Sequence, residues 1–410
     1  VFKYPLDSSK NFIKRIVGMP EEELSLRNGD PWIRPKGETE ARVLRRPRSI
    51  QNAQLRRLDT AGEWRASREA AGSWTMDSKS GGDLIVATGR GEVTFPRTYA
   101  SIRDNYRDGY PEGIKSKIID KDKGSNYHDV SDLRVRAKVT ADEQCREVAF
   151  VLQEGRRKFR FVVPGPAAPE SDRARIEVQG MPADDLPGGL DVALADVERR
   201  LRAGKKLDVE VQNLNDLLSM RLGGDEVLTL EIPPAEGQSQ SRVTLAVEAP
   251  NGSGATVDRL RIWRDVYYTT TQKRPMVTSW TIPPGHYVVL GDNSQDSSDG
   301  RDWEFVRFQR VAEEGDGEIV RGNRREGLQV RADTNPRYVA NGRDSNRRDY
   351  EHIFFRDEFG ERHVFERGEV ERLSEETASL VPRDLIRGRA VLVVWPLAPQ
   401  HDVYRWKWVR

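Results

Sequence analysis

Cysteine is almost absent from the sequence, and so is any long apolar run. The single cysteine, Cys145, cannot form an intramolecular disulfide, and its neighbours in the sequence do not favour a nucleophilic thiol. The five histidines have neither the spacing of a metal site nor that of a catalytic triad, so we expect no metal and no cofactor. No run of 18 apolar residues occurs, which excludes a transmembrane helix within the 410 residues.

The sequence also lacks an excess of charge of either sign. Lysine and arginine number 67, and aspartate and glutamate number 66, so no net field attracts nucleic acid. The arginine-rich stretches 321–325 and 343–348 contain acidic and small polar residues, which is typical of a solvated surface. We therefore expect no nucleic-acid partner. The length of the chain favours two or three separate cores.

Between residues 74 and 264 apolar and polar residues alternate along a series of short segments. Such alternation is typical of antiparallel strands with one buried face, so the sequence predicts a mostly β protein with a sandwich of the jelly-roll kind. The expected strands are 133–139, 148–152, 159–163, 207–211, 217–222, 227–232, 243–247 and 260–262. One helix is expected among them at 190–201, where the apolar residues Leu190, Leu194, Val197 and Leu201 share a helical stripe, and another is expected at 51–58 in the charged connector before this region.

The first 36 residues are predicted to form β structure that includes Lys14. Asn11–Val17 is predicted to be one strand, and Asn28-Gly29 is typical of a tight hairpin turn between residues 24 and 33. On that strand Lys14 has apolar neighbours, and burial of an amine favours its neutral form. A general base must have a pKa near the working pH, so Lys14 qualifies only if it is substantially buried. The alternative is a strand lysine whose ammonium group reaches water.

A second polar segment follows an apolar strand at residues 286–290. The sequence Gly291-Asp292-Asn293-Ser294-Gln295-Asp296-Ser297-Ser298-Asp299-Gly300-Arg301 displays hydroxyls and carboxylates where a strand ends. We expect Asp299 and Arg301 to form charge-assisted hydrogen bonds that fix this loop. A calcium loop is the alternative, although the spacing of the oxygen donors differs from that of an EF-hand.

Three segments taken together resemble the signature blocks of bacterial type I signal peptidases, in the order found in that family. They are the lysine segment 11–20, the Gly-Asp-Asn…Ser-x-Asp-x-Arg segment 291–301, and the late Gly-Arg-Ala…Trp-Pro strand 388–396. Residues 264–269 also resemble the family's strand that leads back to the core. A lysine at the base position, where the eukaryotic branch has histidine, makes the chain resemble the bacterial enzymes.

The resemblance assigns roles to individual residues. Lys14 matches the general base of a serine/lysine protease, and Ser297 matches the hydroxyl that orients it. Asp299 and Arg301 match the ion pair that shapes the loop, and Asp292 and Asn293 match its turn-forming residues. Phe12 and Ile13 match positions that line the shallow pockets for small side chains at the −1 and −3 positions of the substrate.

The sequence departs from the family pattern at three places in these segments. Gly300 stands where many relatives have a second serine, Ser294 stands where an arginine is common, and Glu21-Glu22 follows Pro20 where Gly-Asp or Gly-Glu is usual. The family's nucleophilic serine precedes the first strand seen here. We therefore expect it in a segment before Val1, together with a membrane anchor and part of the oxyanion hole, and we expect residues 1–410 alone to be soluble and inactive.

The resemblance implies a signal peptidase I that removes signal peptides from exported preproteins at the outer face of the bacterial cytoplasmic membrane. Its β core would be discontinuous and would carry two inserts. The predicted parts are core 1–36, connector 37–73, β-sandwich insert 74–264, core 265–312, second insert 313–379, and core with C-terminus 380–410.

An alternative function is that of a non-catalytic envelope protein whose sandwich binds a carbohydrate or a protein partner. The segments around Phe150-Val151-Leu152 and Leu222-Gly223-Gly224-Asp225 loosely resemble concanavalin-like and laminin-G-type sandwiches. Trp74 and Trp263 offer rings that can stack on sugars, although packing in the core is the more common fate of tryptophan.

Overall fold

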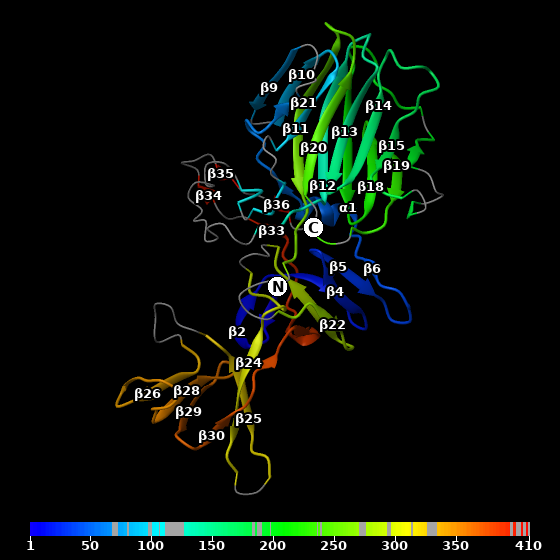
Figure 1. The fold of residues 1–410 in the computed structure, drawn as a ribbon. Coiled ribbons are helices and arrows are strands. Elements are labelled where there is room, and N and C mark those ends of the chain that lie inside the picture. The colour runs from blue at the N-terminus through cyan, green and yellow to red at the C-terminus, as the bar shows by residue number, and fades with distance from the viewer. Residues whose placement is uncertain are drawn as a thin grey trace. The chain divides into compact units, whose positions relative to one another are not determined.

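The computed structural model shows a chain built almost entirely from antiparallel β-strands, as the sequence predicts (Figure 1). It describes residues 1–67, 73–79, 82–96, 101–105, 107–110, 127–182, 185–186, 191–196, 198–235, 237, 240–269, 276–292, 297–312, 315–325, 334–393, 397–398, 403–404 and 407–408. The chain divides into two compact units. Unit 1 comprises Val1–Leu44, Tyr268–Trp395 and Arg405–Arg410, and unit 2 comprises Arg45–Tyr267 and Pro396–Tyr404. The finer division into six parts stays a prediction.

Unit 2 is a β-sandwich of two large sheets that lie face to face (Figure 1). The first sheet has the order β19 (Asp225–Glu231), β18 (Leu217–Leu222), β17 (Lys206–Leu214), β12 (Leu133–Ala141), β21 (Gly254–Arg264), β10 (Gly82–Thr88) and β9 (Ser73–Lys79), with β7 (Arg56–Arg57) paired to β21. The second sheet has the order β16 (Val192–Leu194), β15 (Arg175–Gln179), β14 (Arg157–Pro164), β13 (Glu147–Glu154), β20 (Ser241–Glu248), β11 (Gly91–Phe95) and β8 (Arg65–Ala66). The unit also contains the helix α1 (Arg48–Gln54) and the pair β34 (Leu397–Ala398) and β35 (Val403–Tyr404).

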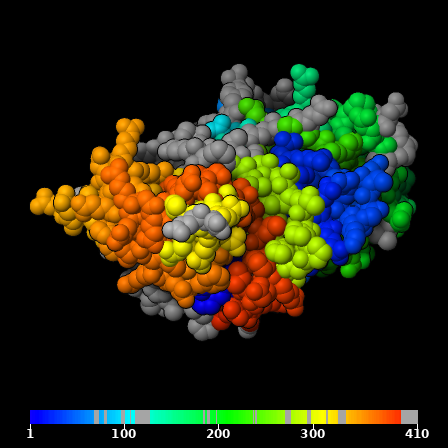
Figure 2. Space-filling model, turned by 90° about the horizontal axis from the view of Figure 1, so that it is seen from below, coloured from blue at the N-terminus to red at the C-terminus, as the bar shows by residue number. Residues whose placement is uncertain are grey.

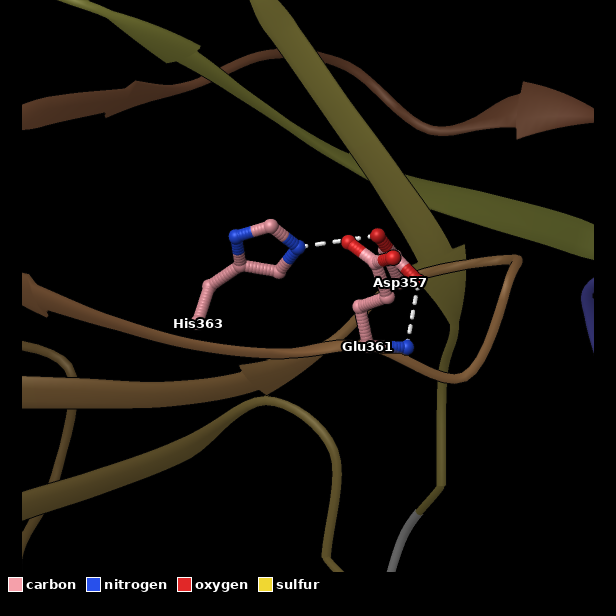
Figure 3. Close-up of side chains that lie close together, drawn as sticks. All are labelled: Asp357, Glu361 and His363. Atoms are coloured by element: carbon pink, nitrogen blue, oxygen red, sulfur yellow. Dashed lines mark hydrogen bonds and ion pairs between the residues drawn. The ribbon is translucent and has the colours of Figure 1, made fainter.

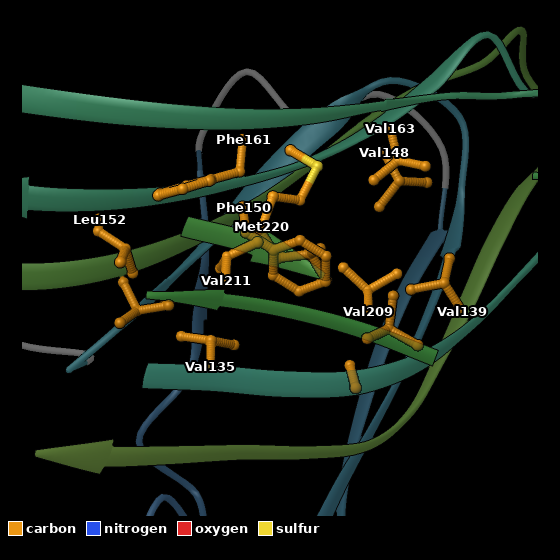
Figure 4. Packing of buried hydrophobic residues seen from close by; sticks show 14 of the residues in the cluster. Val135, Val139, Val148, Phe150, Leu152, Phe161, Val163, Val209, Val211 and Met220 are labelled. Atoms are coloured by element: carbon orange, nitrogen blue, oxygen red, sulfur yellow. The ribbon is translucent and has the colours of Figure 1, made fainter. Parts of the chain in front are cut away.

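The core of the sandwich explains why these strands form. Alternate residues of facing strands point inward and interdigitate, so Phe150 and Phe161 of the second sheet pack with Val211 and Met220 of the first (Figure 4). All four side chains are buried. The intervening residues Arg136, Lys138 and Thr140 of β12 are exposed or half-buried, so the period-two alternation in the sequence predicts which face of the sheet each residue occupies.

Two expectations about helices need correction. The segment expected to be a helix at 190–201 contains β16, whose residues pair with β15. Leu194 is exposed and Leu201 is buried, so these two residues do not share one buried face, while Leu190 and Val197 lie outside the described residues. Pairing with an existing sheet outweighs the helical stripe. The helix expected at 51–58 is α1, which begins at Arg48 and ends at Gln54, before β7.

Unit 1 consists of several small sheets. They are β1 (Phe2–Tyr4) with β2 (Asp7–Phe12); β22 (Ser279–Thr281), β4 (Glu23–Arg27), β5 (Asp30–Arg34) and β6 (Arg42–Val43); β3 (Arg15–Gly18), β23 (His286–Leu290) and β32 (Leu380–Pro382); β25 (Ile319–Asn323), β24 (Glu304–Arg310), β30 (Val370–Arg372) and β31 (Glu376–Thr377); β27 (Arg343–Asp344), β26 (Arg337–Ala340), β28 (His352–Arg356) and β29 (Arg362–Glu366); and β33 (Leu392–Val393) with β36 (Lys407–Trp408). A short 3-10 helix, η5, spans Arg383–Leu385.

The hairpin β4–β5 in unit 1 turns at Asn28-Gly29, as the sequence predicts. Both residues have positive φ, 51° and 91°, which asparagine and glycine adopt more readily than other residues. A cluster that includes the buried side chains of Phe2, Tyr4 and Trp303 forms a core of this unit. Yellow, orange and red atoms in Figure 2 mark the surface formed by the later part of unit 1. In the described part of the chain no helix has the length and hydropathy needed to cross a bilayer.

Candidate active site

Lys14 lies between two strands, not inside one. The predicted strand Asn11–Val17 is wrong in this respect, because β2 ends at Phe12 and β3 begins at Arg15. The partner changes at the break, since β2 pairs with β1 and β3 pairs with β23. The two residues between the strands, Ile13 and Lys14, therefore have no ladder to hold them, and their side chains are free to point in directions that strand periodicity does not predict.

The side chain of Lys14 reaches the loop that follows β23. Its Nζ atom lies 2.7 Å from the Oγ atom of Ser297, a hydrogen bond between residues 283 positions apart. Lys14 is half-buried and Ser297 is buried. The structure thus brings together the two residues that the sequence singled out as a base and its orienting hydroxyl.

Burial lowers the pKa of Lys14 from its ordinary value. Removal of the amine from water is the largest cause and favours the neutral form. Asp299, Asp302 and Asp292 act in the opposite direction because each favours the ammonium form, whereas Arg301 adds to the lowering. The net direction is downward, which is the direction required of a lysine that accepts a proton.

Asp299 and Arg301 form a buried ion pair that organises the loop. The guanidinium of Arg301 donates from Nε to Oδ1 and from Nη2 to Oδ2 of Asp299, each at 2.8 Å, and neither side chain is exposed. The backbone N–H of Gly291 donates to the same carboxylate at 2.8 Å, and Arg301 also donates to the carbonyl oxygen of Thr269 at 2.8 Å. These bonds tie both ends of the loop 291–301 to one carboxylate and so fix the position of Ser297.

The remaining predicted loop residues are placed differently. Asp292 accepts two hydrogen bonds from Arg15, at 3.0 and 2.9 Å, which join the loop to β3. Asn293 lies outside the described residues. Asp292 and Asp299, two of the four oxygen donors of the calcium alternative, each pair with an arginine, and the other two, Asn293 and Asp296, lie outside the described residues.

Phe12 and Ile13 have contrasting surroundings. Phe12 is half-buried and stacks on Tyr4, with ring centroids 4.1 Å apart, and it also contacts the edge of Trp303. Ile13 is 68 % exposed and lies beside the half-buried Lys14 in the sequence. Ile13 is therefore the member of the pair that is open to an incoming molecule.

The steric need for glycine at two positions of the site was not recognised from the sequence. A Cβ atom on Gly291 would lie 1.8 Å from Ser297 Oγ and 3.3 Å from Lys14 Nζ, so a residue without a side chain is required there. A Cβ atom on Gly300 would lie 2.7 Å from the carbonyl oxygen of Ser379, which gives a physical reason for the missing second serine. Only a glycine directly after an apolar strand hints at such close approach, and that signal is common in turns.

We predict that Gly291→Ala destabilises the protein by about 1–3 kcal/mol, the usual cost of forcing an extra methyl group into a packed site. The matched control is Gly388→Ala, because Gly388 has open space around it and no positive φ. Urea denaturation of both variants measures the difference. Equal stability of the two variants would contradict the close packing of Gly291 against Ser297.

Cys145 is not part of this site. It is buried in the sandwich core, and burial raises the pKa of its thiol to about 12. A thiol with so high a pKa is almost fully protonated at neutral pH. This agrees with the sequence-based expectation that Cys145 is not a nucleophile.

Residues 234–318 match the model of the signal peptidase family, peptidase S26. The matched range contains Ser297, Asp299 and Arg301. It does not include Lys14. No curated protein matches the chain.

Solved structures with similar folds share little sequence with this chain. A carbohydrate-binding module from Bacillus subtilis has 10% identity and a TM-score of 0.28, with 49% of this chain and 94% of that chain covered. An endo-β-galactosidase from Clostridium perfringens that releases GlcNAcα1-4Gal has 9% identity and a TM-score of 0.34, with 78% and 81% covered. These likenesses are too weak to support an argument about function.

Proposed function

We propose that this chain carries part of the catalytic core of a bacterial signal peptidase of the serine/lysine type. The observation that carries the proposal is the 2.7 Å contact between Lys14 Nζ and Ser297 Oγ, with the pKa of Lys14 lowered chiefly by burial. The family match over residues 234–318 supports a peptidase lineage. We assign the general base to Lys14 and its orientation to Ser297. The nucleophile is proposed to be a serine in a segment before Val1.

In the proposed mechanism the neutral amine of Lys14 accepts the proton of the nucleophilic hydroxyl. The serine oxygen then attacks the scissile carbonyl carbon, and negative charge develops on the carbonyl oxygen. When the tetrahedral intermediate collapses, the Lys14 ammonium returns its proton to the leaving amine. Water then attacks the acyl-enzyme ester, with Lys14 accepting a proton again and the serine hydroxyl restored. Ser297 keeps the amine aimed at the reacting oxygen throughout.

The proposed substrate is the signal peptide of an exported preprotein in an extended conformation. β3 is an edge strand of its three-stranded sheet, and an extended peptide can pair with such an edge. Exposed Ile13 and half-buried Phe12 border Lys14 and would contact the small side chains at the −1 and −3 positions of the substrate. A membrane anchor before Val1 and a site on the extracytoplasmic face complete this proposal.

The pH dependence of preprotein cleavage by the full-length protein tests this function. Because the neutral amine is the active form, kcat/KM is expected to rise with pH through the Lys14 pKa and to fall away below it. The midpoint should lie below the ordinary lysine pKa, since burial lowers that of Lys14. Absence of cleavage after small residues, or a midpoint at or above the ordinary lysine value, would contradict the proposal.

A second candidate function, ligand binding by the sandwich, has one observation in its favour. Unit 2 contains a polar pocket of about 510 Å³ whose lining includes Arg160, Arg175, Glu147 and Glu177. Arg175 bonds both acids, and Arg160 lies 3.2 Å from Glu177, so the donors and acceptors are held in fixed positions. Neither Trp74 nor Trp263 lines this pocket, so stacking on those rings is not part of it. A full-length protein that bound a saccharide there and cleaved no preprotein would favour this candidate.

A further inference from the structure

The hairpin β28–β29 in unit 1 gathers three side chains that can ligate a metal ion. Its turn begins at Asp357, which is buried and uses Oδ1 to accept the backbone N–H groups of Phe359 at 2.9 Å and Glu361 at 2.8 Å. The other oxygen, Oδ2, lies 2.8 Å from Nε2 of His363. The turn therefore fixes one carboxylate oxygen and directs the other toward an imidazole nitrogen.

The carboxylate of Glu361 completes the group. Figure 3 shows Asp357, Glu361 and His363 converging on one another from the two sides of the turn. One potential ligand atom from each lies within 4.8 Å of the others. Glu361 is exposed and has no ion pair among the described residues, so its carboxylate can move without breaking a contact of that kind.

The spacing of these atoms fits coordination of one ion. Ligand atoms bonded at about 2.1 Å to a zinc-like ion are separated by roughly 3.0 Å in cis octahedral geometry and roughly 3.4 Å in tetrahedral geometry. The observed Asp357–His363 separation of 2.8 Å differs from both by well under one ångström. The Glu361 carboxylate lies within 4.8 Å of both of these residues, and its exposed side chain can adjust.

Neighbouring contacts hold the two inner ligands in place. The imidazole of His363 stacks on the buried ring of Phe365, with centroids 5.7 Å apart and planes 12° apart. The backbone N–H groups that bind Asp357 provide the outer hydrogen bonds that commonly orient metal-bound carboxylates. Glu358, the other acidic residue in the turn, is committed to Arg321 at 2.6 Å and is not a ligand.

We propose that Asp357, Glu361 and His363 bind a divalent transition-metal ion of the zinc type, with water in the remaining positions. Two carboxylates and one imidazole provide two negative charges and a nitrogen donor. The nitrogen favours zinc over magnesium or calcium, which prefer oxygen donors alone. The bound ion would stabilise the turn between β28 and β29. This site is separate from Lys14 and Ser297, so the proposal does not rest on the proposed peptidase function.

Sequence motifs could not reveal this group, because the spacing of Asp357, Glu361 and His363 is not that of a recognised metal motif. The expectation that the protein binds no metal came from that absence. The hairpin brings the residues together through the turn, a feature that local sequence spacing alone does not convey.

Isothermal titration of the purified protein with zinc chloride at pH 7.5 tests the proposal. One zinc ion should bind to these residues, and His363→Ala and Glu361→Gln should each weaken it by at least about tenfold. Glu358→Gln and His352→Ala are matched controls, one from the same turn and one from the facing strand, and both should bind as the unaltered protein does. Glu361 is exposed, so its variant remains informative if a change at buried Asp357 prevents folding.

Cobalt provides a second readout, since bound Co²⁺ should give visible absorption bands that change in His363→Ala. Zinc binding that is unaffected by both ligand variants would overturn the proposal, as would the absence of binding. Magnesium binding as tight as zinc binding would also overturn it, because it would remove any role for the nitrogen donor.

Discussion

Replacing Lys14 by methionine is expected to lower kcat for preprotein cleavage by about 10²–10⁴-fold, the usual contribution of a positioned base. Methionine fills a similar volume but cannot accept a proton. The substrate KM should change little, since Lys14 acts on the reacting hydroxyl and not on the bound peptide. Steady-state kinetics with the full-length protein measure both quantities.

The same substitution is expected to keep or raise the free energy of unfolding at neutral pH. Lys14 has a lower pKa folded than unfolded, so between these two values the unfolded chain binds more protons and stability rises with pH. Below the folded pKa the whole cost of burying the charged amine is present, and methionine removes it. Urea denaturation at pH 7 of both proteins checks this direction.

These two results together separate catalysis from folding. A variant that is at least as stable as the parent and inactive has lost a chemical group and not its structure. Unchanged cleavage by Lys14→Met would remove Lys14 from the mechanism, even if its contact with Ser297 were verified. Activity lost together with stability would show only that the variant folds poorly, and would contradict the stability argument.

Asp299→Ala is expected to reduce stability by about 3–5 kcal/mol, because it leaves the guanidinium of Arg301 buried without its partner. Arg301 is 1% exposed, and Asp299 supplies two of its hydrogen bonds as well as the acceptor for Gly291 N–H. Thermal and urea denaturation measure the loss. The double variant Asp299→Ala/Arg301→Met should recover part of it, since no unpaired charge remains.

Asp292→Ala is the matched control in the same loop. Asp292 pairs with Arg15, and both side chains are partly exposed, so water replaces the lost partner and the expected cost is about 0–1 kcal/mol. A loss for Asp299→Ala no larger than that for Asp292→Ala would contradict the claim that the buried pair fixes the loop.

The sequence predicted eight of the sandwich strands because one physical rule governs them, but it did not identify β9, β10, β11 or β15. Strands such as β12 and β20 have one face in the core, and the period-two pattern follows from that burial. The helix prediction for residues 190–201 was wrong because only three residues form β16. So short a strand has too few alternations for its pattern to stand out against a helical stripe. The break at Ile13 and Lys14 was missed because it arises from a change of partner strand, which no local pattern records.

The candidate site also has some features that the sequence predicts and others that it does not. Lys14, Ser297, Asp299 and Arg301 could be named from the order of three sequence segments, and the structure brings them together. The steric need for Gly291 could not be named, because the atoms that exclude a side chain there come from Ser297 and Lys14. Contacts of this kind depend on tertiary structure and leave no periodic trace in the sequence.

Lys14 and Ser297 are 283 residues apart, so during translation Lys14 is synthesised well before its hydrogen-bond partner. At about 5–20 residues per second, synthesis of the intervening chain takes roughly 15–60 seconds. During that interval the Lys14 amine cannot form its hydrogen bond to Ser297, and β3 cannot pair with β23. A nascent polypeptide therefore has Lys14 without its partner hydroxyl until Ser297 has been translated.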